Sequence, residues 1–278
     1  MATQTTQVAQ TGEQAALAGT IRVAVPEHSL RTDLRAVSIV WRRELIRFQR
    51  DRLRTITSLI QPLLFLLVLG TGLSSLARGS LPSGVDFKTF IYPGVLAMSV
   101  LFTAIFSAAS IVIGKCLGGA TIATMQGIII LALAGLAGVP YDPVLMLILI
   151  GEMLLLAFTL TAFGVMMAAR ITQFQAFMAL TQMLVMPLFF LSGALYPLHG
   201  LPTWLSVLTR LDPLTYVVGP MRHAVFSHLP LSPIAEHVLS PNITWLGWPV
   251  PIPLSLAIVA AMGLGMMGVA IVTFSKPE

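Results

Sequence analysis

The sequence predicts an all-α integral membrane protein with six transmembrane helices, an N-terminal amphipathic interface helix, and re-entrant or interfacial helices on the outer face between spans five and six. Hydrophobic residues make up 56% of the 278 residues and charged residues only 10%, against roughly 25% charged residues in an ordinary soluble domain. Nine of the thirteen arginines lie between Arg22 and Arg54, which leaves long stretches downstream almost without charge. The net charge of +5 therefore indicates a basic juxtamembrane segment, and no nucleic-acid surface.

Six apolar stretches are long enough to cross a bilayer, which requires about 20 residues of helix. They cover residues 56–77, 90–113, 117–139, 144–168, 172–196 and 252–274. We expect a disordered cytoplasmic tail over residues 1–32, the amphipathic interface helix over residues 33–54 and the transmembrane domain over residues 55–278. This division predicts a multi-pass protein of the cell (plasma or inner) membrane.

The distribution of basic residues predicts the orientation of the spans. With six spans, the arginine-rich segment lies on the same side as three other basic residues, Lys115, Arg170 and Lys276. The positive-inside rule places that side in the cytoplasm. Both termini are then cytoplasmic, and the acidic residues on the outside are Asp86, Asp142 and Glu236.

The connection between spans two and three is predicted to be a tight hairpin. Lys115 is the single acidic or basic residue from Thr89 to Val139, and one helix of that length at about 1.5 Å per residue would far exceed the bilayer core. We expect Lys115 to lie in water, with the turn permitted by Gly114, Gly118 and Gly119.

Residues 33–54 have the pattern of an amphipathic helix. Apolar residues step by three and four along one face, at Leu34, Val37, Trp41, Leu45 and Phe48. Basic residues use the same spacing on the opposite face, at Arg43, Arg47, Arg50 and Arg54. Such a helix can anchor the first span in the membrane interface, or it can be a docking surface for a cytoplasmic partner. Periodicity alone favours the anchor.

The segment from residue 197 to 253 differs from the rest of the chain. It holds ten of the eighteen prolines, and its apolar runs are too short or too interrupted to span. Irregular backbone at membrane depth requires protein or water to satisfy its polar groups. We expect short interfacial or re-entrant helices on the outer face, with aromatic residues at headgroup level, namely Trp204, Tyr216, Trp245 and Trp248.

The sequence lacks the motifs of an enzyme or of a direct cofactor site. The Gly114-Lys115 pair is followed by Cys116 and lacks the glycine spacing of a phosphate-binding loop. HExxH and GxSxG are absent, and one cysteine excludes an internal disulfide or a cysteine-rich metal site. We therefore expect no catalytic, cofactor-binding or metal-binding residues, and a channel is disfavoured because no span carries a polar stripe.

Four residues inside the spans are candidates for a polar or gating role: Gln126, Glu152, Gln182 and Pro187. An acidic residue inside a span is costly and usually functional. Glu152 is either such a residue or a carboxyl group hydrogen-bonded to Gln126 or Gln182, and both readings stay open. Pro187 is expected to be a packing kink, because neighbouring groups can satisfy the carbonyl that it frees.

Several stretches resemble the permease subunits of ABC type-2 exporters, in the daunorubicin-resistance-like branch. They are FQRDRLRTITSLIQPLLFLLVLGTGL (48–73), TFIYPGVLAMSVLFTAIFSAASIV (89–112), GKCLGGATIATMQG (114–127), ARITQFQAFMALTQMLVMPLFFLSGALYPL (169–198), LPTWLSVLTRLDPLTYVV (201–218) and Arg222. The resemblance implies a second permease subunit, as a homo- or heterodimer, and separate ATPase subunits that use ATP. It implies outward transport of hydrophobic drugs, antibiotics or lipids. It also favours docking over anchoring, with ATPase-docking candidates Trp41, Arg43, Arg47, Arg50, Arg54, Lys115 and Arg170.

One part of the family pattern is missing from this chain. Members of the family usually have a cytoplasmic loop between spans two and three that supplies a coupling helix, but here residues 110–113 run directly into GKCLGG. Either coupling depends on the amphipathic helix and the loop at Arg170, or the chain is a deletion variant with impaired transport. The alternative function is accordingly a non-transporting or uncoupled membrane protein, such as a relic or an assembly partner.

Overall fold

The computed structural model of the chain describes residues 30–50, 52–74, 81, 85–107, 112–171, 173–196, 198, 201–232, 235, 239, 243–245 and 248–274. Of the tail predicted over residues 1–32, residues 1–29 therefore lie outside the described residues. The chain divides into two compact units, Met1–Arg35 and Ala36–Glu278. Of the first unit, the structure describes the beginning of one helix. The second unit holds the helical bundle.

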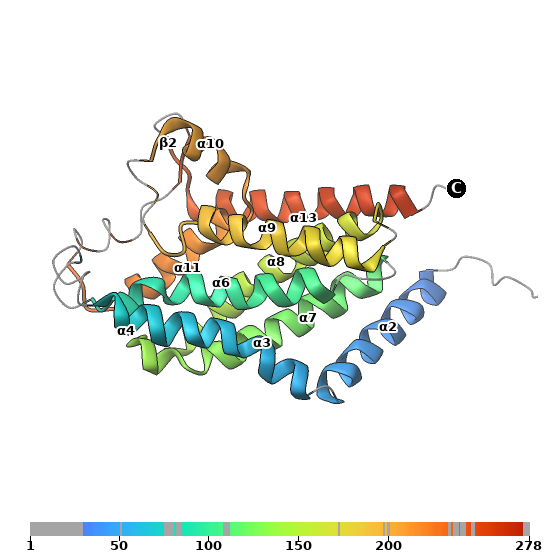
Figure 1. Cartoon of the computed structure of the whole chain (residues 1–278), viewed down its shortest axis with the longest axis horizontal. Coiled ribbons are helices and arrows are strands. Elements are labelled where there is room, and N and C mark those ends of the chain that lie inside the picture. The colour runs from blue at the N-terminus through green and yellow to red at the C-terminus, as the bar shows by residue number, and fades with distance from the viewer. Residues whose placement is uncertain are drawn as a thin grey trace, which may run out of the picture. The chain divides into compact units, whose positions relative to one another are not determined.

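Helices account for nearly all of the described chain (Figure 1). The N-terminal half contains α2 (Leu30–Arg50), α3 (Arg52–Leu64), the π-helix η1 (Phe65–Leu69), α4 (Gly70–Gly72), α6 (Phe87–Ser107) and α7 (Val112–Leu131). The C-terminal half contains the 3₁₀ helix η2 (Ala134–Ala137), α8 (Pro143–Ala168), α9 (Phe174–Leu191), α10 (Thr203–Leu211), α11 (Thr215–Ser227) and α13 (Ile252–Phe274). A two-stranded antiparallel hairpin, β1 (Thr244–Trp245) with β2 (Trp248–Pro249), was not predicted.

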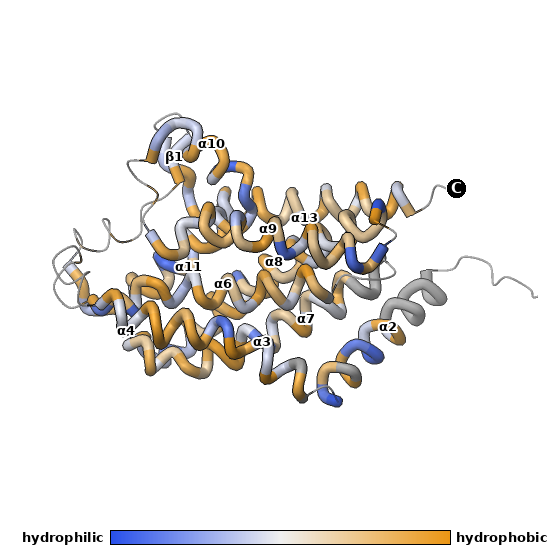
Figure 2. The backbone as a smooth tube through the Cα atoms, viewed as in Figure 1, coloured by the Kyte–Doolittle hydropathy of each residue, from blue (hydrophilic) through white to orange (hydrophobic). Residues whose placement is uncertain are grey.

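Five helical stretches are long and apolar enough to cross a membrane, which confirms an all-α integral membrane protein. Among the described residues they cover 55–72, 87–106, 143–168, 174–191 and 252–274. The apolar part of α7 counted in this way, Cys116–Leu131, is shorter than a full span. Six spans therefore remain a prediction. Figure 2 shows hydrophobic residues along the bundle helices and hydrophilic residues gathered on α2.

Local sequence explains where the long helices begin and end. Asp142 starts α8, because its Oδ1 accepts hydrogen bonds from the backbone N–H groups of Val144 (2.8 Å) and Leu145 (3.1 Å), and Pro143 suits the first helical position. The helix predicted to reach residue 139 ends instead at Leu131. There the Tyr141 hydroxyl donates to the Ala132 carbonyl (2.8 Å) and accepts from the Gly135 N–H (3.0 Å), which holds a short 3₁₀ turn.

The predicted hairpin between spans two and three is present, but its predicted turn is wrong. The Tyr92 hydroxyl in α6 donates to the Ile130 carbonyl at the end of α7 (3.1 Å), so the two helices are antiparallel neighbours. Gly114, Gly118 and Gly119 lie inside α7, which begins at Val112. The residues between Ser107 and Val112 lie outside the described part of the chain.

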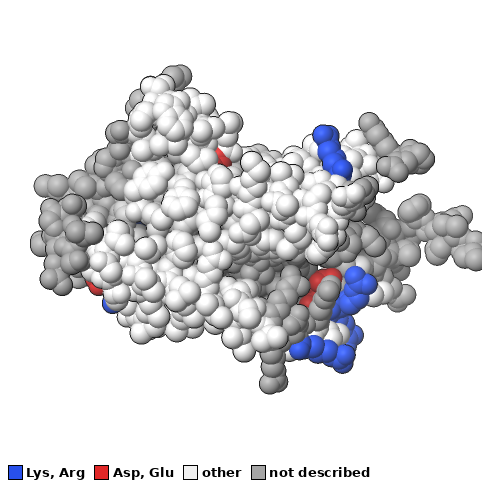
Figure 3. All heavy atoms as spheres, in the orientation of Figure 1, with Lys and Arg blue, Asp and Glu red and all other residues white. Residues whose placement is uncertain are grey.

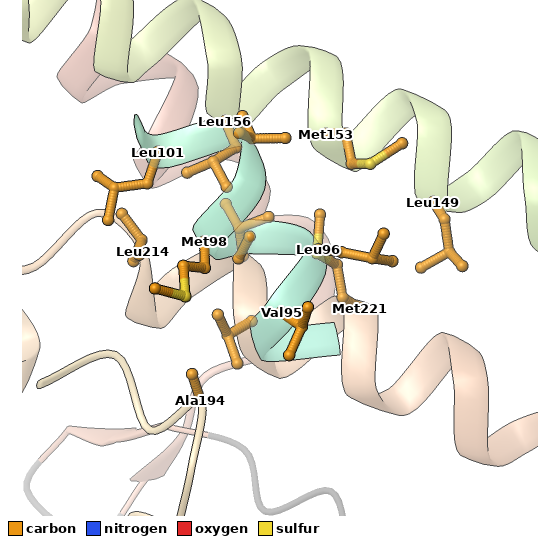
Figure 4. Close-up of a cluster of buried hydrophobic side chains, with 14 of the residues drawn as sticks. Val95, Leu96, Met98, Leu101, Leu149, Met153, Leu156, Ala194, Leu214 and Met221 are labelled. Carbon is orange, nitrogen blue, oxygen red and sulfur yellow. The ribbon is translucent and has the colours of Figure 1, made fainter. Parts of the chain in front are cut away.

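Helix α6 lies at the centre of the core. It packs against α3, α7, α8, α9 and α11, and most of its apolar side chains are buried. Figure 4 shows this cluster, with Val95, Leu96, Met98 and Leu101 of α6 near Leu149, Met153, Leu156, Ala194, Leu214 and Met221. By contrast, few residues of α3, α9 and α13 are fully buried, and many of their apolar side chains are exposed at least in part. Such surface suits lipid or another membrane-embedded subunit.

Candidate functional site

The amphipathic helix α2 packs on the first half of α7. Trp41 Nε1 donates a hydrogen bond to Thr121 Oγ1 at 3.0 Å. Next to it, a Cβ atom placed on Gly118 would lie 3.1 Å from both Cβ and Cγ of Glu44. Since only glycine leaves room for so close an approach, Gly118 permits the contact with α2.

Glu44 was missed at the level of sequence. Its side chain is only 5% exposed, and its Oε1 has no hydrogen-bond partner within the described residues. Arg43 Nη2 lies 3.8 Å from this oxygen, beyond hydrogen-bond distance. Spacing could have revealed this position, because Glu44 lies three residues after Trp41 and four before Phe48, on the apolar stripe itself.

Gln126 connects three helices, and neither of its hydrogen bonds among the described residues goes to Glu152. Thr103 Oγ1 of α6 donates to Gln126 Oε1 (2.6 Å), and Gln126 Nε2 donates to Ser58 Oγ of α3 (2.5 Å). Each interhelical hydrogen bond of this kind contributes roughly 0.6 kcal/mol inside a membrane. Gln182 is exposed. Glu152 is buried, and its Oε2 has no partner among the described residues.

Pro187 does not interrupt its helix, whereas the first span contains an irregularity that was not predicted. Helix α9 continues through Pro187 to Leu191. In the first span, the buried Pro62 is followed by the π-helix η1, and the Phe65 and Phe189 rings meet edge to face at 5.6 Å. A π-bulge frequently accompanies a functional position in a helix. Here it lies where the first span contacts α9.

Arg222 attaches the connection after α9 to the bundle. The side chain is 3% exposed, and its Nη2 donates to the carbonyls of Gly193 (2.8 Å) and Ala194 (3.3 Å). Its guanidinium carbon lies 4.3 Å from the centre of the Phe90 ring in α6, a cation–π contact. Gly94 of α6 packs directly against Ala194 as well. Two independent contacts therefore hold this connection in place.

A buried acidic residue organises the outer segment. Asp212 is 1% exposed and caps α11: Oδ1 accepts from the Leu214 N–H (3.0 Å) and Oδ2 from the Thr215 hydroxyl (3.3 Å). Burial raises the pKa of Asp212 to about 8, since removal from water disfavours the charged form.

Tyr216 was predicted at headgroup level, but it is buried. Its hydroxyl donates to the Arg210 carbonyl (2.9 Å) and accepts from Trp245 Nε1 (3.1 Å). Trp204, Trp245 and Trp248 are exposed, as an aromatic belt requires. The two short helices expected in this segment are α10 and α11, and the tyrosine links them to the unpredicted hairpin.

Comparison with known proteins decides the family. The family model described as "ABC-2 type transporter" matches residues 35–113 and 102–226, well over half of the chain. The chain belongs to this family. Nodulation protein J of Rhizobium leguminosarum bv. trifolii is 27% identical over 224 residues, covering 72% of this chain and 84% of that protein. The protein of Cyanophora paradoxa named as a transport permease, ycf38, is 25% identical over 214 residues, covering 68% and 73%.

Family and relatives together indicate the membrane subunit of an ABC transporter, a transport permease that spans the membrane several times. Membership of this family implies an ABC ATPase as partner and lipid as surroundings. The two matched segments of the permease overlap at residues 102–113. The daunorubicin-resistance-like branch remains a resemblance.

The docking candidates of the permease are distributed over α2, the start of α3, the start of α7 and the residues just after α8. Arg43 and Arg50 of α2 are exposed, and Arg170 is exposed just after α8. The side chains of Arg47, Arg54 and Lys115 lie outside the described residues. Figure 3 shows basic side chains gathered over α2, whereas the bundle surface in that view is nearly free of charge. Trp41 differs from the arginines, because it packs on α7.

Proposed function

We propose that this chain is the permease subunit of an ABC exporter that moves a hydrophobic or amphiphilic compound, such as a drug, an antibiotic or a lipid, outward across the cell membrane. The energy comes from ATP hydrolysis in a separate ATPase subunit, and the permease itself is non-catalytic and binds no cofactor. Membership of the ABC-2 type transporter family is the observation that carries this proposal.

The geometry of α2 supports docking of the ATPase. Arg43 and Arg50 point into solvent from a helix whose other face packs on α7. A helix fixed to the bundle in this way presents its guanidinium groups in one orientation, and guanidinium groups recognise carboxylates in a fixed geometry. An acidic surface on the cytoplasmic ATPase is the partner that such a face fits, with both termini of the permease on the cytoplasmic side.

The exposed apolar helices support a second permease subunit and a membrane-borne cargo. Helices α3, α9 and α13 expose much of their apolar length, and each faces either lipid or a partner helix in the assembled transporter. A hydrophobic cargo can enter such a structure sideways from the bilayer. The transporter then consists of two permease subunits, as a homo- or heterodimer, with their ATPase subunits.

The test is reconstitution with an ATPase. The permease is co-expressed with a candidate partner ABC ATPase, and inside-out membrane vesicles are supplied with the hydrophobic dye Hoechst 33342. An exporter co-purifies with the ATPase and accumulates dye in the vesicle lumen when ATP is added. An ATPase that cannot hydrolyse ATP serves as the control. Co-purification with ATP-driven dye movement out of the lumen would contradict the outward direction.

The alternative is a non-transporting or uncoupled membrane protein. It is favoured by one observation: residues 110–113 run directly into GKCLGG, so that the sequence lacks the loop that supplies a coupling helix in the family. The same experiment separates the two functions. A chain that co-purifies with the ATPase but leaves ATP hydrolysis unchanged and moves no dye supports the uncoupled protein.

A further inference from the structure

A permease whose sequence lacks the family's loop before GKCLGG requires another route for movement from the ATPase to the bundle. The described residues contain one helix that is both basic on its exposed face and in direct contact with α7, namely α2.

The contact between α2 and α7 is unusually specific for a helix that lies at a membrane interface. Trp41 Nε1 donates to Thr121 Oγ1 at 3.0 Å, a polar bond between side chains 80 positions apart in the sequence. One helical turn further along α2, the Glu44 side chain lies so close to Gly118 that a Cβ atom there would be 3.1 Å from it. These two contacts, one turn apart, join α2 to α7.

The burial of Glu44 shows that this face of α2 belongs against protein. A helix that rests on lipid headgroups keeps its carboxylates in water, because burying a charge without partners is costly. Glu44 is 5% exposed while Arg43, its neighbour, is 68% exposed. The Glu44 side chain therefore lies in the contact between α2 and α7, and the Arg43 side chain remains outside it.

We propose that Trp41, Glu44, Gly118 and Thr121 form a rigid joint through which a docked ATPase moves α7 directly, in place of the missing coupling helix. This inference rests on the proposed function, since it requires an ATPase bound at α2. The four residues are positioning residues: they control how far ATP hydrolysis responds to the permease, and they leave association with the ATPase intact.

The first test uses a disulfide and requires no ATPase. Replacement of the single cysteine by Cys116→Ala gives a background for the pair Glu44→Cys and Gly118→Cys. The Cβ atoms at these positions would lie 3.1 Å apart, close to the range of about 3.5–4.5 Å found in disulfides. Mild oxidation of native membranes should cross-link the pair. Absence of the cross-link would overturn the joint.

The second test measures coupling in the purified complex of permease and ATPase. Under reducing conditions the double-cysteine variant should bind the ATPase but lose about fivefold or more of the permease-stimulated ATP hydrolysis. Oxidation should restore the stimulation, because the disulfide replaces the lost contact. A residue with only a structural role would show no such rescue. Stimulation that disappears on oxidation would contradict a rigid joint.

A wedge variant and its matched control complete the design. Gly118→Leu should push α2 away from α7 and lose the stimulation while it keeps the ATPase bound. Gly151→Leu introduces the same side chain on α8, where a Cβ meets nothing within 4 Å, and should behave as the parent chain. Normal stimulation in Gly118→Leu would overturn the inference. A parent chain that forms the cross-link but binds no ATPase would overturn the proposed function and the coupling role with it.

Discussion

Replacing Gly94 by alanine is expected to destabilise the permease, although alanine is the better helix former. A Cβ atom at Gly94 would lie 2.8 Å from both the Cα and the carbonyl oxygen of Ala194, and closer still to its Cβ. Non-bonded carbon atoms rest at about 3.5–4.0 Å, so that α6 or the connection after α9 must shift by about 1 Å. The obstacle is backbone that Arg222 also holds, and it cannot rotate away.

The magnitude follows from two opposing effects. Overpacking a tight contact costs about 1–3 kcal/mol, and contact with backbone argues for the upper end of that range. Alanine in place of a helical glycine contributes about 0.5–1 kcal/mol of stability. The net loss is about 2 kcal/mol, which lowers Tm by about 4–8 °C in a chain of this size.

The assay is thermal unfolding in detergent, followed by tryptophan fluorescence. Gly151→Ala is the matched control, because a Cβ at Gly151 meets nothing within 4 Å, and its Tm should rise slightly. Adding Ala194→Gly to Gly94→Ala should recover part of the loss, since it removes the Cβ contact but leaves the other two. A Tm that rises in Gly94→Ala as in Gly151→Ala would refute the close contact of α6 with Ala194.

Three further predictions concern the termini of the bundle and its outer segment. Because burial raises the pKa of Asp212 to about 8, the folded chain holds this proton more firmly than the unfolded chain. The stability of the permease should therefore fall as the pH rises from about 4 to 8. A series of Tm measurements against pH should be flatter in Asp212→Asn. Replacing Arg43, Arg47, Arg50 and Arg54 by glutamine should weaken co-purification with the ATPase while insertion into membranes stays normal. Intact binding with scrambled orientation would mark the amphipathic helix as an anchor. Single cysteines in a Cys116→Ala background should react with an impermeant maleimide added outside whole cells at positions 86 and 141 but not at positions 170 and 276, and the reverse pattern would overturn the orientation.

The class of the protein and the extent of its longest helices could be read from the sequence. The spans predicted at residues 144–168 and 252–274 correspond to α8, Pro143–Ala168, and α13, Ile252–Phe274. Both predictions succeed for a local reason. A bilayer requires an unbroken apolar helix of sufficient length whose backbone hydrogen bonds are made within the helix itself. Whether a stretch meets this requirement depends only on residues that are consecutive in the sequence.

The amphipathic pattern of α2 was also visible in the sequence, but its most informative residue was not. Periodicity assigns Trp41 to one face and the arginines to the other, as the structure has them. It cannot say that Glu44, on the same face as Trp41, lies over a glycine more than seventy positions later in the chain. That pairing requires knowledge of which helix packs on α2.

Tertiary packing alone decided the remaining features. Gln126 bonds to Ser58 and Thr103 rather than to Glu152, Gly118 receives a neighbouring helix rather than forming a turn, and Arg222 reaches carbonyls 28 and 29 positions away. Apolar periodicity identifies a buried face but carries no information about its partner, because lipid and a neighbouring helix are equally apolar. The sequence by itself therefore determined that the chain lives in a membrane and where its long helices run. The choice of neighbours, and with it the joint between α2 and α7, was decided by the fit of side chains that meet only when the helices are assembled.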